Sequence, residues 1–163
     1  MKKAYFAAGC FWGVEHLFKK ITGVIETTVG YCGGTLEYPT YEQVLTGKTG
    51  HLETVEVVYD PKKISFNELV KIFFEIHDFT QEDGQGPDIG EQYRSVIFTN
   101  NKDEIEIIKK IIDYLQKQGY KVATEIKPFE KFWKAEDYHQ DYYSKKMQIP
   151  YCHYRRNIKW NEL

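Results

Sequence analysis

The chain has 163 residues, enough for one well-buried core and too few for two domains of ordinary size. Its formal net charge is -2, and its 22 lysine and arginine residues are spread along the chain, which excludes the basic surface typical of proteins that bind nucleic acid or anionic membranes. We therefore expect a single domain, residues 1–163, that acts as a monomer and has neither nucleic acid nor a membrane as a partner.

Three cysteines, Cys10, Cys32 and Cys152, are an odd number at wide spacing. This pattern differs from the disulfide framework of small secreted proteins and lacks the short paired spacing of zinc sites, so we expect a cytoplasmic protein without a metal. Lys2 and Lys3 precede an apolar run, but that run is shorter than the roughly 7–15 residues of a signal-peptide core. No stretch approaches the roughly 20 apolar residues of a membrane span.

Apolar periodicity and turn residues predict alternating strands and helices in the first half of the chain. Ser65-Phe66-Asn67-Glu68 has the pattern of a capping box, which marks the start of a helix. The predicted segments are strands at 4–8, 24–31 and 52–59, helices at 14–20 and 65–77, and a loop rich in turn residues at 35–50.

The second half continues the alternation and then becomes irregular. The predicted segments are an ordered or mobile functional loop at 80–90, strands at 93–99 and 120–126, an amphipathic helix at 102–118, and a short helix around 138–145 within an irregular C-terminal segment. The order β-α-β-β-α-β at the centre predicts an α/β fold of two layers (α+β), with a ferredoxin-like plait as its core and an added helix and strand.

Cys10 lies where the first predicted strand gives way to the first predicted helix, in Gly9-Cys10-Phe11-Trp12-Gly13. The unpaired backbone N–H groups of a helix start and the positive end of its dipole favour the thiolate, which is the nucleophilic form. Phe11 and Trp12 would place apolar surface beside the thiol, as suits a small uncharged substrate group. The same residues also fit a buried structural cysteine between two core aromatics, because reactivity depends on exposure.

Glu53 lies near the start of the strand predicted at 52–59. Side chains alternate faces along a strand, so Glu53 shares the apolar face with Val55, Val57 and Tyr59. Loss of hydration would favour the neutral carboxyl, which can act as a general acid near neutral pH. The alternative is that Glu53 bends toward water or pairs with a base.

Six strings of residues, taken together and in order, resemble the peptide methionine sulfoxide reductases of the MsrA type. The resemblance runs from about Ala4 to Cys152, nearly the whole chain. The strings are Gly9-Cys10-Phe11-Trp12-Gly13, Pro39-Thr40-Tyr41, Thr49-Gly50-His51-Leu52-Glu53, Tyr59-Asp60-Pro61, Gly90-Glu91-Gln92-Tyr93-Arg94-Ser95 and His139-Gln140-Asp141-Tyr142.

The resemblance implies reduction of one epimer of methionine sulfoxide, free or in proteins, to methionine. By this resemblance Cys10 is the nucleophile and Glu53 is the acid that protonates the sulfoxide oxygen. Tyr41 and Tyr93 would donate hydroxyl hydrogen bonds to that oxygen, and Asp88 would orient and polarise the site or merely cap a loop. A thiol, an acid and hydroxyl donors suit the chemistry, because a sulfoxide is a poor electrophile until its oxygen is protonated or strongly hydrogen-bonded.

The same resemblance assigns Phe11 and Trp12 to substrate binding, where they would surround the methyl group of the sulfoxide. His51 and His139 also lie in matching strings. We expect both histidines to support the site through hydrogen bonds rather than to catalyse the reaction.

Regeneration of the thiol follows from the same chemistry. The cysteine sulfenic acid condenses with a second thiol to a disulfide, and an external dithiol such as thioredoxin then reduces it without any bound cofactor. Cys152 matches the recycling cysteine of many relatives, although the more distal cysteine that some carry is absent. Cys32 stands where relatives often have a small residue. We expect Cys152 rather than Cys32 to be the resolving thiol.

Two other classes of function fit parts of the pattern. A cysteine-dependent hydrolase would pair Cys10 with a histidine base, for which His16, His51 and His139 are available. A non-catalytic module could bind peptides through an aromatic patch of Phe11, Trp12 and the tyrosines. Formation of a sulfenate at Cys10, rather than an acyl-enzyme or no covalent change, would distinguish the reductase from both.

Overall fold

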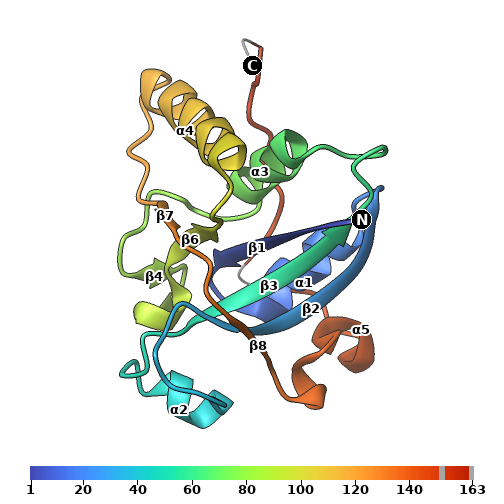
Figure 1. Cartoon of the computed structure of the whole chain (residues 1–163), viewed down its shortest axis with the longest axis vertical. Coiled ribbons are helices and arrows are strands. Elements are labelled where there is room, and N and C mark those ends of the chain that lie inside the picture. Colours follow the sequence, from blue (N-terminus) through green and yellow to red (C-terminus); the bar gives the residue numbers. More distant parts are fainter. Residues whose placement is uncertain (151–152, 162–163) are drawn as a thin grey trace.

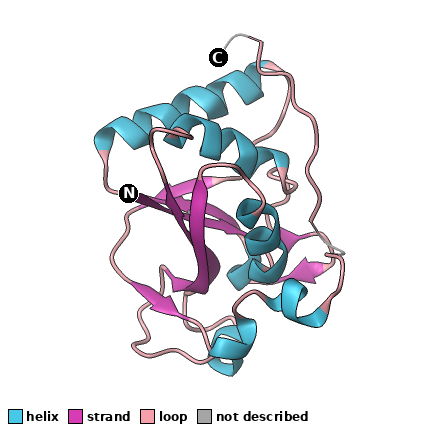
Figure 2. Ribbon diagram, turned by 90° about the vertical axis from the view of Figure 1, so that its right-hand side faces the viewer, coloured by secondary structure: helices cyan, strands magenta, loops and turns pink. Residues whose placement is uncertain are grey.

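The computed structural model describes residues 1–150 and 153–161. Six of its strands form one twisted sheet with the helices outside it (Figures 1 and 2). The main strands are β1 (Lys2–Ala8), β2 (Val24–Cys32), β3 (Leu52–Tyr59), β6 (Ser95–Phe98), β7 (Glu125–Lys127) and β8 (Phe132–Lys134). The helices are α1 (Phe11–Lys19), α2 (Tyr41–Leu45), α3 (Phe66–Glu75), α4 (Lys102–Lys117) and α5 (Tyr142–Lys146). A small hairpin pairs β4 (Gly84–Gln85) with β5 (Asp88–Ile89), and 3-10 turns occupy Glu91–Tyr93 and Asp137–His139.

The six strands lie in the order β7-β6-β1-β3-β2-β8. The four central strands pair antiparallel throughout, and with α1 and α3 they form the predicted β-α-β-β-α-β unit. Strand β7 adds to one edge in parallel with β6, and β8 adds to the other edge antiparallel to β2. The predicted ferredoxin-like core with an added helix and strand is therefore confirmed.

Several predicted boundaries in the loops were wrong. The loop at 35–50 contains α2, where the Thr40 hydroxyl accepts the Gln43 N–H and the Gln43 side chain accepts the Thr40 N–H in a capping box. Tyr93 lies in a 3-10 turn, so the strand predicted at 93–99 begins at Ser95. The strand predicted at 120–126 is confined to β7, and β8 follows it. These elements have five residues or fewer, too short for a periodic signal.

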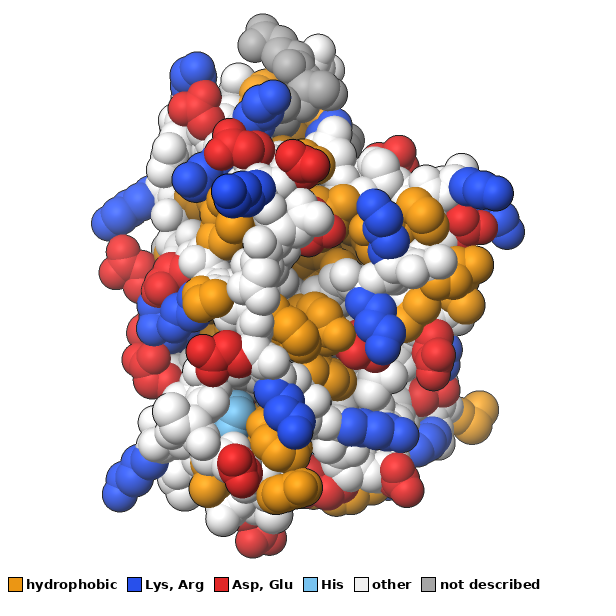
Figure 3. Space-filling model, viewed as in Figure 1, with side chains coloured by type: hydrophobic (Ala, Val, Ile, Leu, Met, Phe, Trp, Pro, Cys, Tyr) orange, Lys and Arg blue, Asp and Glu red, His pale blue; other side chains and the backbone are white. Residues whose placement is uncertain are grey.

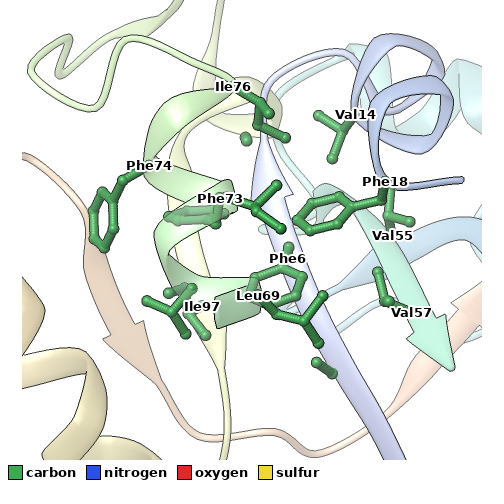
Figure 4. Close-up of a cluster of buried hydrophobic side chains, with 14 of the residues drawn as sticks. Phe6, Val14, Phe18, Val55, Val57, Leu69, Phe73, Phe74, Ile76 and Ile97 are labelled. Carbon is green, nitrogen blue, oxygen red and sulfur yellow. The ribbon is translucent and has the colours of Figure 1, made fainter. Parts of the chain in front are cut away.

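The main core lies on the sheet face that α1 and α3 cover (Figure 4). The ring of Phe6 from β1 stacks on Phe18 of α1 at 4.9 Å and on Phe73 of α3 at 5.4 Å, measured between centroids. A smaller cluster lies on the opposite face, where Tyr5 stacks on Phe129 at 4.1 Å. Both faces are thus buried around the centre of the sheet, which fixes its register.

The surface carries acidic and basic side chains that are interspersed on the face in Figure 3. Both methionines of the chain lie at the surface, with Met1 78% and Met147 92% exposed, so aromatic and aliphatic side chains fill the core. Among the helices in the described ranges, none combines the length and apolar character needed to cross a bilayer.

Candidate active site

Cys10 is the N-cap residue of α1, directly after the turn that ends β1. Gly9 makes this turn with a φ of +92°, a conformation that costs glycine little. Cys10 is 7% exposed, and the first turn of α1 contains no acidic residue that would oppose a thiolate. The structure therefore places the thiol at the helix start, where backbone N–H groups and the helix dipole favour the anion.

Glu53 lies on the buried face of β3, where β-sheet pairing places it opposite Tyr31. It is 1% exposed, and its Oε1 accepts the backbone N–H of Phe11 at 3.2 Å, which brings the carboxyl to the turn that holds Cys10. Within the described residues, its buried Oε2 has no hydrogen-bond partner. Burial, followed by the charge of Cys10, raises the pKa of Glu53 well above its ordinary value. The form of the carboxyl that carries a proton is therefore favoured to a higher pH than in a carboxyl exposed to water.

Two tyrosine hydroxyls belong to the same group of side chains. Tyr41 is the first residue of α2, and Glu136 accepts its backbone N–H at 3.0 Å. Tyr93 ends the 3-10 turn before β6. Burial raises the pKa of both phenols, and the acidic groups around them, Glu53, Cys10 and Asp88, act in the same direction when they are ionised. Both side chains are therefore hydrogen-bond donors at neutral pH.

Asp88 reaches this group from the small β4–β5 hairpin. The side chain of Gln85 fixes the hairpin, because its amide accepts the Asp78 N–H at 2.8 Å and donates to the Asp78 carbonyl at 2.9 Å. Asp88 Oδ2 is buried and, in the part of the chain that the structure describes, accepts no hydrogen bond. The loop at 80–90 thus places a buried carboxyl oxygen, without a hydrogen-bond partner among the described residues, next to Glu53, Tyr41 and Tyr93.

Aromatic rings surround the turn. Phe11 is fully buried and lies 5.7 Å from Tyr31 and 6.3 Å from Tyr41 between ring centroids. Trp12 is partly buried and stacks on Tyr142 at 3.8 Å with an interplanar angle of 8°. The residues that resemblance assigned to substrate binding therefore lie beside Cys10 and the phenols, as a site for a small apolar group requires.

The two histidines from the matching strings hold other parts of the structure. His51 Nδ1 accepts the Gly34 N–H at 3.1 Å, and its Nε2 lies 2.7 Å from the Leu36 carbonyl. His139 Nδ1 accepts the indole N–H of Trp12 at 2.9 Å. Both imidazoles thus have supporting contacts, which weakens the case for either one as the base of a thiol hydrolase.

The sheet separates Cys32 from the group around Cys10. Because Tyr31 pairs with Glu53, the next residue, Cys32, pairs with Leu52 and faces the smaller cluster on the other side. Burial raises the pKa of the Cys32 thiol to about 12, so it stays protonated. Cys152, the expected resolving thiol, lies outside the described residues.

Three contacts around the site were not predicted. The ring of His153 lies against Gly9 and Gly13, with its Nε2 2.6 Å from the Ala8 carbonyl. A Cβ atom at Gly13 would lie 2.3 Å from His153 Nδ1, so the spacing Gly9-x3-Gly13 was a signal for a close approach. Glu15 and Gln140 also make long-range hydrogen bonds, which the polar character of these residues did not predict, and Glu15 is buried.

Among residues 1–150 and 153–161, no three His, Cys, Asp or Glu side chains are arranged to hold a metal ion. The side chains that converge on Cys10 are instead two carboxyl groups, Glu53 with its raised pKa and Asp88, together with two phenols and apolar rings. This arrangement can supply a nucleophilic sulfur and proton donors to one small polar group within an apolar substrate.

Comparisons with known proteins agree with this chemistry. A family model described as peptide methionine sulfoxide reductase matches residues 2–163. Two proteins named peptide methionine sulfoxide reductase MsrA, from Nautilia profundicola and Methanosarcina acetivorans, are 49% and 50% identical to this chain over 94% and 90% of it, and over 89% and 79% of their own lengths. The crystal structure of Mxr1 from Saccharomyces cerevisiae in reduced form has a TM-score of 0.89 at 38% identity and covers 96% of this chain and 92% of its own. The chain therefore belongs to the peptide methionine sulfoxide reductase family.

Proposed function

We propose that the chain is a single catalytic domain, 1–163, that reduces one epimer of methionine sulfoxide to methionine with Cys10 as the nucleophile. The observation that carries this proposal is the buried carboxyl of Glu53, which is held at the turn with Cys10 and whose burial favours the form that carries a proton. A thiol hydrolase needs a base that removes a proton, whereas this group donates one. Membership of the reductase family supports the same chemistry.

In the first step, the sulfoxide oxygen accepts hydrogen bonds from Tyr41, Tyr93 and Glu53. Transfer of the Glu53 proton to this oxygen makes the sulfur electrophilic enough for the Cys10 thiolate to attack it. A bond between the Cys10 sulfur and the substrate sulfur forms, and the sulfur–oxygen bond of the substrate breaks. The protonated oxygen passes to the Cys10 sulfur as the sulfur–sulfur bond breaks, so that the thioether leaves as methionine and Cys10 becomes a sulfenic acid. The substrate is reduced by two electrons and the Cys10 sulfur is oxidised by two.

In the second step, a resolving thiol attacks the Cys10 sulfur and releases water as the disulfide forms. We propose Cys152 for this role, because Cys32 faces the other side of the sheet. An external dithiol then reduces the disulfide and restores both thiols without a bound cofactor. Mxr1 from Saccharomyces cerevisiae has been solved in complex with Trx2, at 30% identity and a TM-score of 0.65, which supports a thioredoxin as the reductant.

Peptide mapping after a single turnover tests the reaction class and the resolving thiol together. The reduced chain is mixed with one equivalent of a methionine sulfoxide peptide without reductant. The chain is then digested, and the masses of the cysteine-containing fragments are measured by mass spectrometry. We expect a disulfide between Cys10 and Cys152, and a trapped sulfenic acid on Cys10 in the Cys152→Ser variant. The Cys32→Ser variant is the control and should give the parental disulfide.

Other products would contradict these assignments separately. A disulfide between Cys10 and Cys32 in the parent, with normal recycling of Cys152→Ser, would transfer the resolving role to Cys32. An acyl adduct on Cys10 after exposure to an ester, without any reduction of sulfoxide, would identify a hydrolase. Unmodified Cys10 after mixing with substrate would favour a binding module.

The two phenols should have partly overlapping roles. A hydrogen bond contributes about 1 kcal/mol, so Tyr41→Phe and Tyr93→Phe should each slow the single-turnover reduction roughly fivefold. The double variant should lose more than the product of the single losses, because each hydroxyl can partly replace the other. Tyr5→Phe is the control, because the Tyr5 hydroxyl donates to Glu56 outside the site. Independent effects of the two substitutions would contradict a shared oxygen.

A further inference from the structure

Glu15 is a buried carboxylate with two ordered partners from distant elements. It lies on α1 and is 3% exposed. One oxygen accepts the backbone N–H of Asp141 at 2.7 Å, and the other accepts the hydroxyl of Thr27 at 2.9 Å. Removing a carboxyl group from water is costly. The burial of Glu15 in α1, little more than one turn beyond Cys10, therefore suggests that its hydrogen bonds to Asp141 and Thr27 position these residues.

The Asp141 N–H belongs to a strained point of the chain. Asp141 has φ +55° and ψ 40° directly before α5, a left-handed conformation that is uncommon for residues other than glycine. Such conformations persist only where surrounding contacts impose them. The hydrogen bond to Glu15 and the ion pair of the Asp141 carboxylate with Lys19, at 2.7 Å, are two such contacts, both from α1.

The residues on either side of this point hold the Trp12 indole. His139 accepts the indole N–H at 2.9 Å, and the ring of Tyr142 stacks on the indole at 3.8 Å. Gln140 fixes only the first part of this segment, because its side chain pairs with the N–H and carbonyl of Val29 on β2. The contacts to α1, together with the hydrogen bond of the Asp141 carboxylate to Ser144, set the direction in which the chain leaves Asp141 and hence the place of Tyr142.

We propose that Glu15 is a positioning residue for substrate binding, which holds the left-handed turn at Asp141 so that Tyr142 fixes Trp12 beside Cys10. This role rests on the proposed function, in which Trp12 contacts the substrate. Glu15 is not a catalytic residue, because both of its oxygens are occupied by Asp141 and Thr27. It acts through the peptide backbone of Asp141 on an aromatic side chain of its own helix.

The test compares Glu15→Leu with the conservative Glu15→Gln. Glutamine keeps an oxygen for the Asp141 N–H, and its amide can donate to the Thr27 hydroxyl, whereas leucine leaves the buried N–H without an acceptor. With a chemical dithiol as reductant, Glu15→Leu should raise the KM for a methionine sulfoxide peptide roughly tenfold and change kcat less than about threefold. Glu15→Gln should keep the parental KM.

Two further readouts separate positioning from a general loss of stability. In a Trp133→Phe, Trp160→Phe background, Glu15→Leu should shift the emission of Trp12 to longer wavelength as its ring loses Tyr142. Tyr142→Ala should raise KM by a similar factor, and its combination with Glu15→Leu should cost no more than either change alone, because both act through one contact. Glu56→Gln, which alters the carboxyl that accepts the Tyr5 hydroxyl, is the matched control with parental KM.

A parental KM and unchanged Trp12 emission in Glu15→Leu would overturn the proposal, and so would additive effects with Tyr142→Ala. If Glu15→Leu does not fold, Glu15→Asp takes its place, because the shorter carboxylate cannot reach both partners and should change KM in the same direction. The emission readout does not depend on turnover. Parental chain that reduces no sulfoxide would therefore refute the proposed function while the Trp12 signal still judges the role of Glu15.

Discussion

Replacement of Cys10 by serine is expected to abolish methionine sulfoxide reduction while leaving the fold intact. A hydroxyl at this position is a far weaker nucleophile than a thiolate and cannot form the sulfenic acid on which the cycle depends. Serine is also a favoured N-cap residue, and Cys10 makes no side-chain cap hydrogen bond of its own, so α1 should begin at the same place. Substrate consumption measured by chromatography and thermal unfolding followed by circular dichroism would check both parts.

The control for this experiment is Cys32→Ala. Cys32 is fully buried on the opposite face of the sheet, so its replacement should lower stability by about 1 kcal/mol and leave the rate of sulfoxide reduction unchanged. Measurable turnover of sulfoxide by Cys10→Ser would refute Cys10 as the nucleophile. A comparable loss of activity in Cys32→Ala would show that the sheet does not separate the two thiols functionally.

Glu53→Gln is expected to slow the first step by roughly 10²–10⁴-fold, the usual cost of losing a positioned proton donor. Glutamine keeps the shape of the side chain and an oxygen for the Phe11 N–H, so substrate binding should persist. A rapid-mixing experiment without reductant would measure the single-turnover rate. A variant within a few-fold of the parent would make Glu53 structural.

The titration of Glu53 determines how the rate of the same step changes with pH. Burial raises the pKa of this carboxyl, so the proton that it donates is present below the raised value and is lost as the pH rises through it. Ionisation of the Cys10 thiol should make the parental single-turnover rate rise with pH, and loss of the Glu53 proton should make it fall again as the pH passes the raised pKa. This fall should be absent in Glu53→Gln. Glu56→Gln, on the same strand but hydrogen-bonded to Tyr5, should keep the parental profile.

Local patterns in the sequence were sufficient to predict the turn at Cys10 and the face on which Glu53 lies. Both depend on neighbours within a few residues: the change from strand to helix after Gly9, and the alternation of side chains along β3. The capping pattern from Thr40 to Gln43 was also present, and it could have revealed that Tyr41 begins a helix.

The remaining features depend on contacts between distant parts of the chain. Glu15 and Asp141 are 126 positions apart, and His153 meets Ala8 across 145 positions. No periodicity reports such a contact, because it arises only after the sheet has brought α1, α5 and the C-terminal segment together. The burial of Glu15 could therefore not be predicted from its polar character.

The placement of methionine on the surface has a consequence for the conditions in which the protein works. Oxidation turns a flexible apolar thioether into a polar sulfoxide, which disrupts a core that contains it. In this chain the added oxygen would meet water at Met1 or Met147, and no packed contact in the interior would be broken. Oxidation of its own methionines would therefore leave the packing of the core unchanged.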